Sequence, residues 1–239
     1  LAYKRRLVDE RYGDVVAVVE RPGVHDAAAE LWAMVNAAAP GAVSHSAPDE
    51  HPIVRCGVGT QEDWCLLVSV DGALVLAAGC VCFPTKWVLR EKIGRPMGEV
   101  HRPVAFYAEQ LEAPVDAHFE RLPVDRPVWR QNWNLMDDPE LFQPGPGHPS
   151  AHNGEITAAN AGERVWLRTE RQTLRRLPAT GAIAFSIRVH QRPVAALADD
   201  ELATLRTAVA NLPPETADYK GVPAFGQALG SWIERRLAG

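Results

Sequence analysis

The chain has few cysteines, no long apolar run and no strong excess of charge of either sign. It contains four cysteines in 239 residues and carries a formal charge of −5. Disulfide-stabilised secreted domains are rich in cysteine, and nucleic-acid binders usually present a basic surface or stripe. A membrane-spanning helix needs ~20 consecutive apolar residues. We therefore expect no disulfide framework, no nucleic-acid partner and no membrane span.

The cysteines lie in apolar stretches, such as WCLLVSV and AAGCVCF. Such surroundings predict reduced thiols in a core. A zinc ribbon would need two closely spaced pairs, and only Cys80 and Cys82 are close. The first residues, LAYKRRLVDERYGD, lack the apolar core of a signal peptide. We expect a cytoplasmic protein.

Two pairs of apolar or alternating runs predict antiparallel hairpins. WCLLVSV and ALVLAAGCVCF flank Asp71-Gly72, a dipeptide that favours a type I′ turn because both positions have positive φ. LRTERQTLRRLP and AIAFSIRVH flank a turn at residues 178–181. A further strand is predicted at VWRQNWNLM, residues 128–136.

Helical patterns lie between and outside these strands. Thr85 is a predicted N-cap, and Gly94 a predicted end, of the helix that follows the first hairpin. Pro114 interrupts the next long helical pattern. The predicted helices are residues 26–39, 86–93, a short helix from Pro96, 106–122, 198–212 and 224–237.

The order of elements is two strands, several short helices and then three strands. We predict an α+β fold, with a PAS-like antiparallel sheet whose helices are inserted between strands 2 and 3. Such helices leave a pocket against the sheet that suits a flat cofactor. Residues 1–239 are predicted to form a single domain, with helical extensions at about residues 1–45 and 197–239.

The strand at residues 167–178 is unusually polar. It contains four arginines, a glutamate and a glutamine. A period of two separates an apolar side from a polar side. The polar side consists of Trp166, Arg168, Glu170 and Gln172. This side can bind a polar ligand inside the domain, but a solvated edge strand protected by its arginines would show the same residues.

Three blocks of sequence resemble one family. They are CFPTKWVLREKIGRPMGEVHRPV at 82–104, RPVWRQNW at 126–133 and LRTERQTLRRLPATGAIAFSIRV at 167–189. In this order they are similar to the heme-dependent oxidative N-demethylase alpha-subunit family. The similarity extends from the first helix to the DYKG turn at 218–221. Thr85-Lys86 and Ala105 depart from the family pattern, in which we expect Ser-Arg and proline.

The resemblance implies a PAS-like domain that binds heme b. It implies an oxygen-activating monooxygenase that oxidatively removes a methyl group from a small methylated amine, with dioxygen as the second substrate. Electrons would come from NAD(P)H through a partner reductase that carries flavin and an iron–sulfur cluster. The alternatives are a heme-based gas sensor without turnover and an interaction subunit that has lost the cofactor. A sensor normally needs an effector domain or a long coiled coil, and the sequence shows neither.

His101 is the predicted iron ligand, because it follows the short helices inside the block with the strongest family similarity. A neutral imidazole binds iron while its other nitrogen is held by an acceptor. His118 is the second choice, since it lies on the helix where PAS heme sensors place their ligand. His148 and His152, in a Pro/Gly loop, and Cys82 are weaker candidates. Taken alone, His101 is also typical of a hydrogen-bonding residue at a helix end.

The polar strand face supplies the predicted catalytic residues. Arg168 and Gln172 are expected to stabilise negative charge on bound oxygen, and Glu170 to hold a protonated amine. Arg130 and Asn132 share a face of the neighbouring strand and extend the polar lining. A structural salt bridge between Glu170 and an arginine would explain the same residues without a ligand.

Two further sets of residues are expected to contact the porphyrin. Arginines on the other side of the strand match heme propionates through their guanidinium fork, unless they face solvent. These are Arg171, Arg175 and Arg176. Tryptophans can form apolar walls for the ring, although tryptophans on strands are more often ordinary core residues. The candidates are Trp87, Trp129, Trp133 and Trp166.

Overall fold

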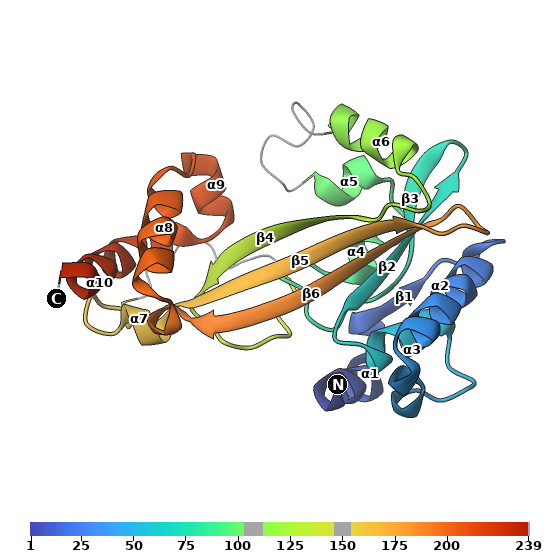
Figure 1. The fold of residues 1–239 in the computed structure, drawn as a ribbon, viewed down its shortest axis with the longest axis horizontal. Helices are drawn as coiled ribbons and strands as arrows, with labels where there is room; N and C mark the ends of the chain where they lie inside the picture. The colour runs from blue at the N-terminus through green and yellow to red at the C-terminus, as the bar shows by residue number, and fades with distance from the viewer. Residues whose placement is uncertain (103–111, 146–153, 239) are drawn as a thin grey trace. The chain divides into compact units, whose positions relative to one another are not determined.

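The computed structural model describes residues 1–102, 112–145 and 154–238 (Figure 1). The chain divides into two compact units. Unit 1 consists of Leu1–Gln131, Leu141–Gly145 and Arg171–Val189. Unit 2 consists of Asn132–Glu140, Pro146–Glu170 and His190–Gly239.

The strands of the described residues form one six-stranded sheet in the order β1-β3-β2-β6-β5-β4. They are β1 Val16–Val18, β2 Asp63–Val70, β3 Ala73–Cys80, β4 Val128–Met136, β5 Trp166–Arg176 and β6 Ile183–Pro193. β2 pairs antiparallel with both β3 and β6, and β1 pairs antiparallel with β3. The predicted α+β class is confirmed, while the PAS-like topology stays a prediction.

The hairpin at Asp71-Gly72 is confirmed. Both residues have positive φ, 50° and 83°, and Val70 pairs with Ala73 across the turn. The predicted second hairpin is also present, since Leu177 donates its backbone N–H to the carbonyl of Ala182 at the end of β5 and β6. Turn residues between apolar or alternating runs therefore located both hairpins.

The helices before the first hairpin and those after β3 differ in how well the sequence predicts them. The first group is α1 Ala2–Val15, α2 Val24–Ala38 and α3 Pro52–Gly59, and the second is α4 Leu89–Lys92, α5 Met97–His101 and α6 Glu112–Arg121. The predictions of α2 and α5 are confirmed, and α6 agrees over its described residues. The helices α1 and α3 and the short strand β1 were not individually predicted, because α1 is rich in charged residues and α3 contains two glycines.

The predicted N-cap at Thr85 is wrong. The helix α4 begins only at Leu89, with Val88 as its N-cap, and Thr85 forms a bridge with Gln143 instead. Lys86 has a φ of 60°, which lies outside the right-handed helical region. The backbone therefore cannot continue as a helix from Thr85. Gly94, with a φ of 77°, does follow the end of α4 as predicted.

The sheet of unit 1 is covered on both faces (Figure 1). On one face, Leu66 and Ala78 pack with apolar residues of α1, α2 and α3. On the other face, Cys65 and Leu67 pack with residues of α4, α5 and α6. The alternation along β2 thus sends neighbouring residues into two separate cores. The second of these cores carries His101 at the end of α5.

Unit 2 has its own apolar core. Its helices are α7 Ala161–Arg164, α8 Asp199–Ala210, α9 Pro214–Tyr219 and α10 Gly226–Ala238. Val165, Leu202 and Leu229 are buried together there. Gly162 lies so close to the ring of Trp232 that no side chain fits at this position. The predicted helices at 198–212 and 224–237 are confirmed as α8 and α10.

The four cysteines are free and buried, as predicted. Burial raises the pKa of the Cys56 thiol to about 12, so the thiol stays protonated at neutral pH. Among the described residues, no helix combines the length and the apolar character that crossing a membrane requires.

Candidate functional site

His101 is a half-buried residue at the end of α5. Its Nδ1 lies 3.0 Å from the carbonyl oxygen of Met97, one turn earlier. A carbonyl oxygen only accepts hydrogen bonds, so Nδ1 carries the proton, and in the neutral ring the lone pair is on Nε2. Burial lowers the pKa of His101 and outweighs the Met97 bond, and the charges of Lys92 and Arg130 lower it further. The ring is therefore neutral near pH 7.

This arrangement fits an axial heme ligand. Metal-bound imidazoles normally donate their other N–H to a carboxylate, a backbone carbonyl or water, which sets the tautomer and the ring orientation. His101 is held in this way by a backbone carbonyl, and its neutral form is the one that coordinates iron. Within the described ranges, no group of three or more His, Cys, Asp or Glu side chains is arranged to hold a metal ion.

Three cationic side chains accompany His101, and we call Lys92, Arg102 and Arg130 the cationic cluster. The Lys92 ammonium donates to the carbonyl of Val100, the residue before His101. Arg130, on β4, donates through Nε to Oε1 of Gln172 at 2.8 Å. The structure thus brings together three of the sequence-predicted residues, His101, Arg130 and Gln172, in unit 1.

The predicted polar face of β5 is buried. Arg168 is 0% exposed, Glu170 6% and Gln172 8%, while Arg171 between them is exposed. β5 lies between β6 and β4 in the sheet and is not an edge strand. The interpretation of this segment as a solvated edge strand is therefore wrong. Buried charge of this density needs polar partners or a ligand.

The opposite side of β5 is different. Arg171 and Arg175 are exposed, and the Arg171 guanidinium lies 5.2 Å from the centroid of the Trp129 ring. Trp129 itself is 62% exposed, so it is not a buried wall. The prediction that Arg176 shares this side is wrong. The side chain of Arg176 alternates to the side of Gln172, where its guanidinium donates to the carbonyls of Leu122 and Phe119 near the end of α6.

In unit 2, the DYKG segment, which begins at the end of α9, contacts β4 and lies near Glu170. Lys220 donates to the carbonyl of Trp133 and lies 4.7 Å from the centroid of that ring. Partial burial and the negative charge of Glu170 raise the pKa of Tyr219. Arg168 donates to Gln191 at 3.4 Å. Sequence reasoning missed Tyr219 and Lys220 as site residues, although their turn lies inside the region of family similarity.

The remaining candidates occupy varied positions. Asn132 and Trp166 are half-buried, and Trp87 packs against the core that contains α4, α5 and α6. His118 is exposed on α6, with its ring centroid 6.5 Å from that of Phe119. Cys82 is fully buried, and its pKa is raised, first by the hydrogen bond with Cys80 and then by burial. His148 and His152 lie outside the described residues.

Two surface cavities do not coincide with these residues. A cavity of about 280 Å³ lies beside the β2–β3 hairpin and is lined by Val19, Val24 and Val75 among others. A cavity of about 230 Å³ lies against α10 and is lined by Phe225 and Gln227 among others. Neither has a sequence-predicted site residue in its wall.

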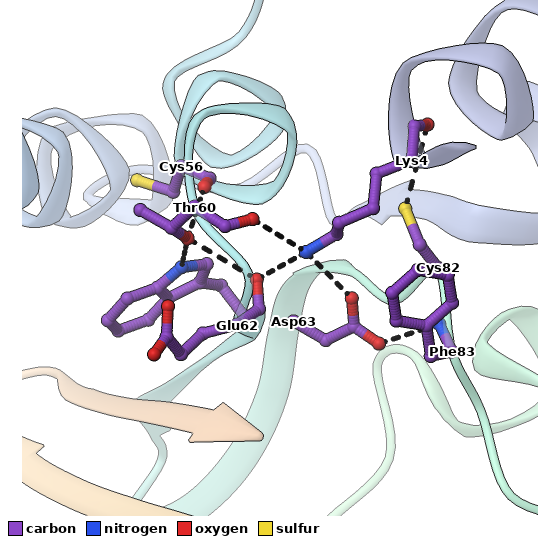
Figure 2. A network of polar contacts seen from close by, with 8 residues as sticks. Lys4, Cys56, Thr60, Glu62, Asp63, Cys82 and Phe83 are labelled. Atoms are coloured by element: carbon purple, nitrogen blue, oxygen red, sulfur yellow. Dashed lines mark hydrogen bonds and ion pairs between the residues drawn. The ribbon is translucent and has the colours of Figure 1, made fainter. Parts of the chain in front are cut away.

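A buried ion pair in unit 1 was also missed by the sequence reasoning (Figure 2). Lys4 Nζ lies 3.0 Å from Asp63 Oδ1, and both side chains are 1% exposed. The ammonium also donates to the carbonyls of Thr60 and Glu62, while Asp63 Oδ2 accepts from the backbone N–H of Phe83. This network joins α1 to β2 and to the segment after β3. The Lys4 ammonium and Asp63 Oδ2 are both hydrogen-bonded to backbone groups, and the two charges neutralise each other, which indicates a structural role.

The sequence match supports the site that His101 suggests. Residues 39–230 match the family described as "Haem-dependent oxidative N-demethylase, alpha subunit-like". The match covers well over half of the chain and contains His101, the cationic cluster, the buried face of β5 and the DYKG turn. The chain belongs to the haem-dependent oxidative N-demethylase, alpha subunit-like family.

Proposed function

We propose that this protein binds heme b and oxidatively demethylates a small methylated amine, with electrons supplied from NAD(P)H by a separate flavin and iron–sulfur reductase. The observation that carries the proposal is His101, a neutral imidazole fixed through Nδ1 in a chain of a heme-dependent family. Heme, when bound, would supply the iron that binds and activates dioxygen. The strand order β3-β2-β6-β5-β4, with α4, α5 and α6 between β3 and β4 along the chain, supports a PAS-like sheet.

His101 would hold the iron through Nε2. The Met97 carbonyl keeps the proton on Nδ1, so the lone pair of the neutral ring stays on the coordinating nitrogen. Burial and the neighbouring positive charges keep this ring neutral near pH 7. Trp133 and Trp166, both half-buried, would supply apolar walls for the porphyrin.

The buried face of β5 would bind the amine substrate. Glu170 is a buried carboxylate and would hold the protonated amine as a charged hydrogen-bonding partner. Arg168 and Gln172 would donate hydrogen bonds to negative charge that develops during the reaction, in surroundings that exclude water. Asn132 would extend this lining. Because the strand is inside the sheet, these side chains are positioned before the substrate binds.

Hemin titration of the purified protein tests the heme ligand. His101→Ala should abolish the Soret band that wild type develops, because it removes the proposed iron ligand. His118→Ala is the matched control, since it removes an exposed imidazole and should leave the spectrum unchanged. Full retention of heme by His101→Ala would refute the ligand assignment.

Turnover is tested separately with dimethylamine, NAD(P)H and a flavin and iron–sulfur reductase. Formaldehyde release is expected from wild type, and Glu170→Gln should lower it by 10- to 100-fold because the amine loses its charged partner. Intact heme binding with no formaldehyde release from any methylated amine would favour the sensor function instead.

A further inference from the structure

The cationic cluster combines one half-buried lysine with two exposed arginines. Lys92 is half-buried, and its ammonium is bonded to the carbonyl of Val100. Burial lowers the pKa of Lys92, Glu91 opposes this shift, and the charges of Arg95 and Arg102 lower the pKa further. Together with Arg130, these groups concentrate positive charge at the end of α5.

Among the described residues near α4 and α5, the ion pairs are formed by arginines that do not belong to the cationic cluster. Arg95 pairs with Glu99 at 3.5 Å, and Arg90 pairs with Asp14 at 3.4 Å. The described ranges contain no carboxylate within ion-pair distance of Lys92, Arg102 or Arg130. Like charges that are held in no ion pair repel one another, and an anion relieves this repulsion.

Arg130 is oriented for such an anion. Its Nε is bonded to Oε1 of Gln172, which fixes the plane of the guanidinium. A guanidinium held at Nε presents its two terminal nitrogens, whose N–H groups match the two oxygens of a carboxylate. Arg130 is exposed, so an anion can reach it from solvent or at the edge of a bound ligand.

The two sides of the sheet distinguish this cluster from the other arginines. Gln172 and Leu174 are on one side of β5, and Leu174 packs against the core formed with α4, α5 and α6. Arg171 and Arg175 alternate to the other side, where Arg171 contacts Trp129. His101, at the end of α5, feels the charges of Lys92 and Arg130. Lys92 and Arg130 therefore share the surroundings of the proposed iron ligand, whereas Arg171 and Arg175 lie on the other side of β5.

We propose that Lys92 and Arg130 bind the carboxylates of the heme, that Gln172 positions Arg130, and that Arg171 and Arg175 take no part. This inference rests on the proposed function. It places the propionate contacts on the side of the sheet that α4, α5 and α6 cover, and not on the side of Arg171. It also adds Lys92, which the sequence did not indicate. The positive charge of Arg102 further attracts the same carboxylates.

The experiment compares two porphyrins in each protein variant. Hemin and hemin dimethyl ester differ only in that both carboxylates of the ester are methylated and uncharged. Apoprotein is titrated with each, and the dissociation constant is read from the Soret band. Wild type should bind hemin at least about tenfold more tightly than the ester. Lys92→Gln and Arg130→Gln should each weaken hemin binding about tenfold and leave ester binding unchanged.

Matched controls test the assignment to one face. Arg171→Gln and Arg175→Gln remove exposed guanidinium groups from the other side of the same strand, and both affinities should stay at the wild-type values. Lys92→Arg keeps the charge and should restore the preference for hemin, which separates loss of charge from loss of folding. Gln172→Ala should weaken hemin binding less than Arg130→Gln.

The outcomes separate the inference from the proposed function. If neither porphyrin binds, the proposed function fails, and the inference fails with it. If both porphyrins bind wild type equally, or if Arg171→Gln lowers the preference for hemin while Lys92→Gln and Arg130→Gln do not, heme binding stands and the carboxylate site is refuted.

Discussion

The Lys4–Asp63 pair and the cationic cluster both place charge in unit 1, and they differ in what balances that charge. Lys4 and Asp63 neutralise each other and bond to backbone groups of the segment before β2 and of the segment after β3. The cationic cluster has no carboxylate in ion-pair distance among the described residues. A balanced buried pair stabilises one arrangement of the chain, whereas unbalanced like charge near the surface favours an anionic ligand. Substitution should therefore reduce stability much more at the balanced pair than in the cationic cluster.

The largest effect is expected at the balanced pair. Lys4→Met leaves the Asp63 carboxylate buried without its cation, which should lower the free energy of unfolding by about 3–5 kcal/mol. Urea denaturation followed by circular dichroism measures the change. Arg5→Met is the control on the same helix, because its partners Asp9 and Glu50 are both more exposed than Asp63, and it should cost less than Lys4→Met. Equal effects of the two variants would contradict a structural role for the pair.

A smaller effect is expected when the same type of charge is removed from the cationic cluster. Lys92→Met loses the bond to Val100 but also relieves repulsion from Arg95 and Arg102, so the free energy of unfolding of the apoprotein should change by less than about 1 kcal/mol. The same urea titration applies, and hemin binding should weaken in parallel. A loss as large as that of Lys4→Met would mean that Lys92 is a structural residue.

The pH dependence of stability sharpens the comparison further. Burial lowers the folded-state pKa of His101, so the folded protein binds fewer protons than the unfolded chain near pH 6. The contribution of His101 to stability is full above the unfolded-state pKa of about 6.5 and is lost as the pH falls from that value through the lower folded-state pKa. Stability should therefore fall as the pH is lowered from 7.5 to 5.5. Thermal melts across this range measure it.

A second histidine must be separated from His101 in these melts. His51 accepts the backbone N–H of Ile53 at the start of α3, and burial together with the charge of His25 lowers its pKa. His51→Asp keeps an acceptor at the N-cap and removes this titration. In the His51→Asp protein, Lys92→Gln should make stability depend less on pH, because it removes a positive charge that lowers the pKa of His101. An unchanged profile would contradict the coupling between them.

The smallest effect is expected on the opposite face of the sheet. Trp129→Ala removes an exposed ring and its contact with Arg171, which is worth about 0.5–1 kcal/mol at exposed sites. Hemin affinity should not change, because this face is not part of the proposed site. Fluorescence-detected unfolding and the hemin titration check both statements, and weaker hemin binding would require a porphyrin contact at Trp129.

Much of the site was predictable because it depends on local geometry. The alternation along β5 separates Arg168, Glu170 and Gln172 from Arg171, and it needs only the period of a strand. The same rule places Arg176 on the side of Gln172. The prediction that Arg176 lies on the side of Arg171 was wrong because it contradicts the period of the strand. The N-cap at Thr85 failed for another reason, since the positive φ of Lys86 has no strong local signal in a lysine.

Long-range contacts were not predictable in this way. Lys4 lies in the basic run KRR, which is typical of a solvated helix, and its burial depends on Asp63 from a strand far along the chain. Tyr219 and Lys220 become site candidates only because their turn packs against Trp133 and near Glu170. Neither pairing has a spacing that a periodic pattern can reveal.

The sequence by itself determined the hairpin at Asp71-Gly72, the two sides of β5 and the family similarity, because turn preferences and the pleat are properties of neighbouring residues. Only the tertiary structure decided that the polar side of β5 is buried, that Arg130 is fixed by Gln172 and that His101 lies among unbalanced cations. These facts depend on which elements pack together, and packing joins residues that are far apart in the chain.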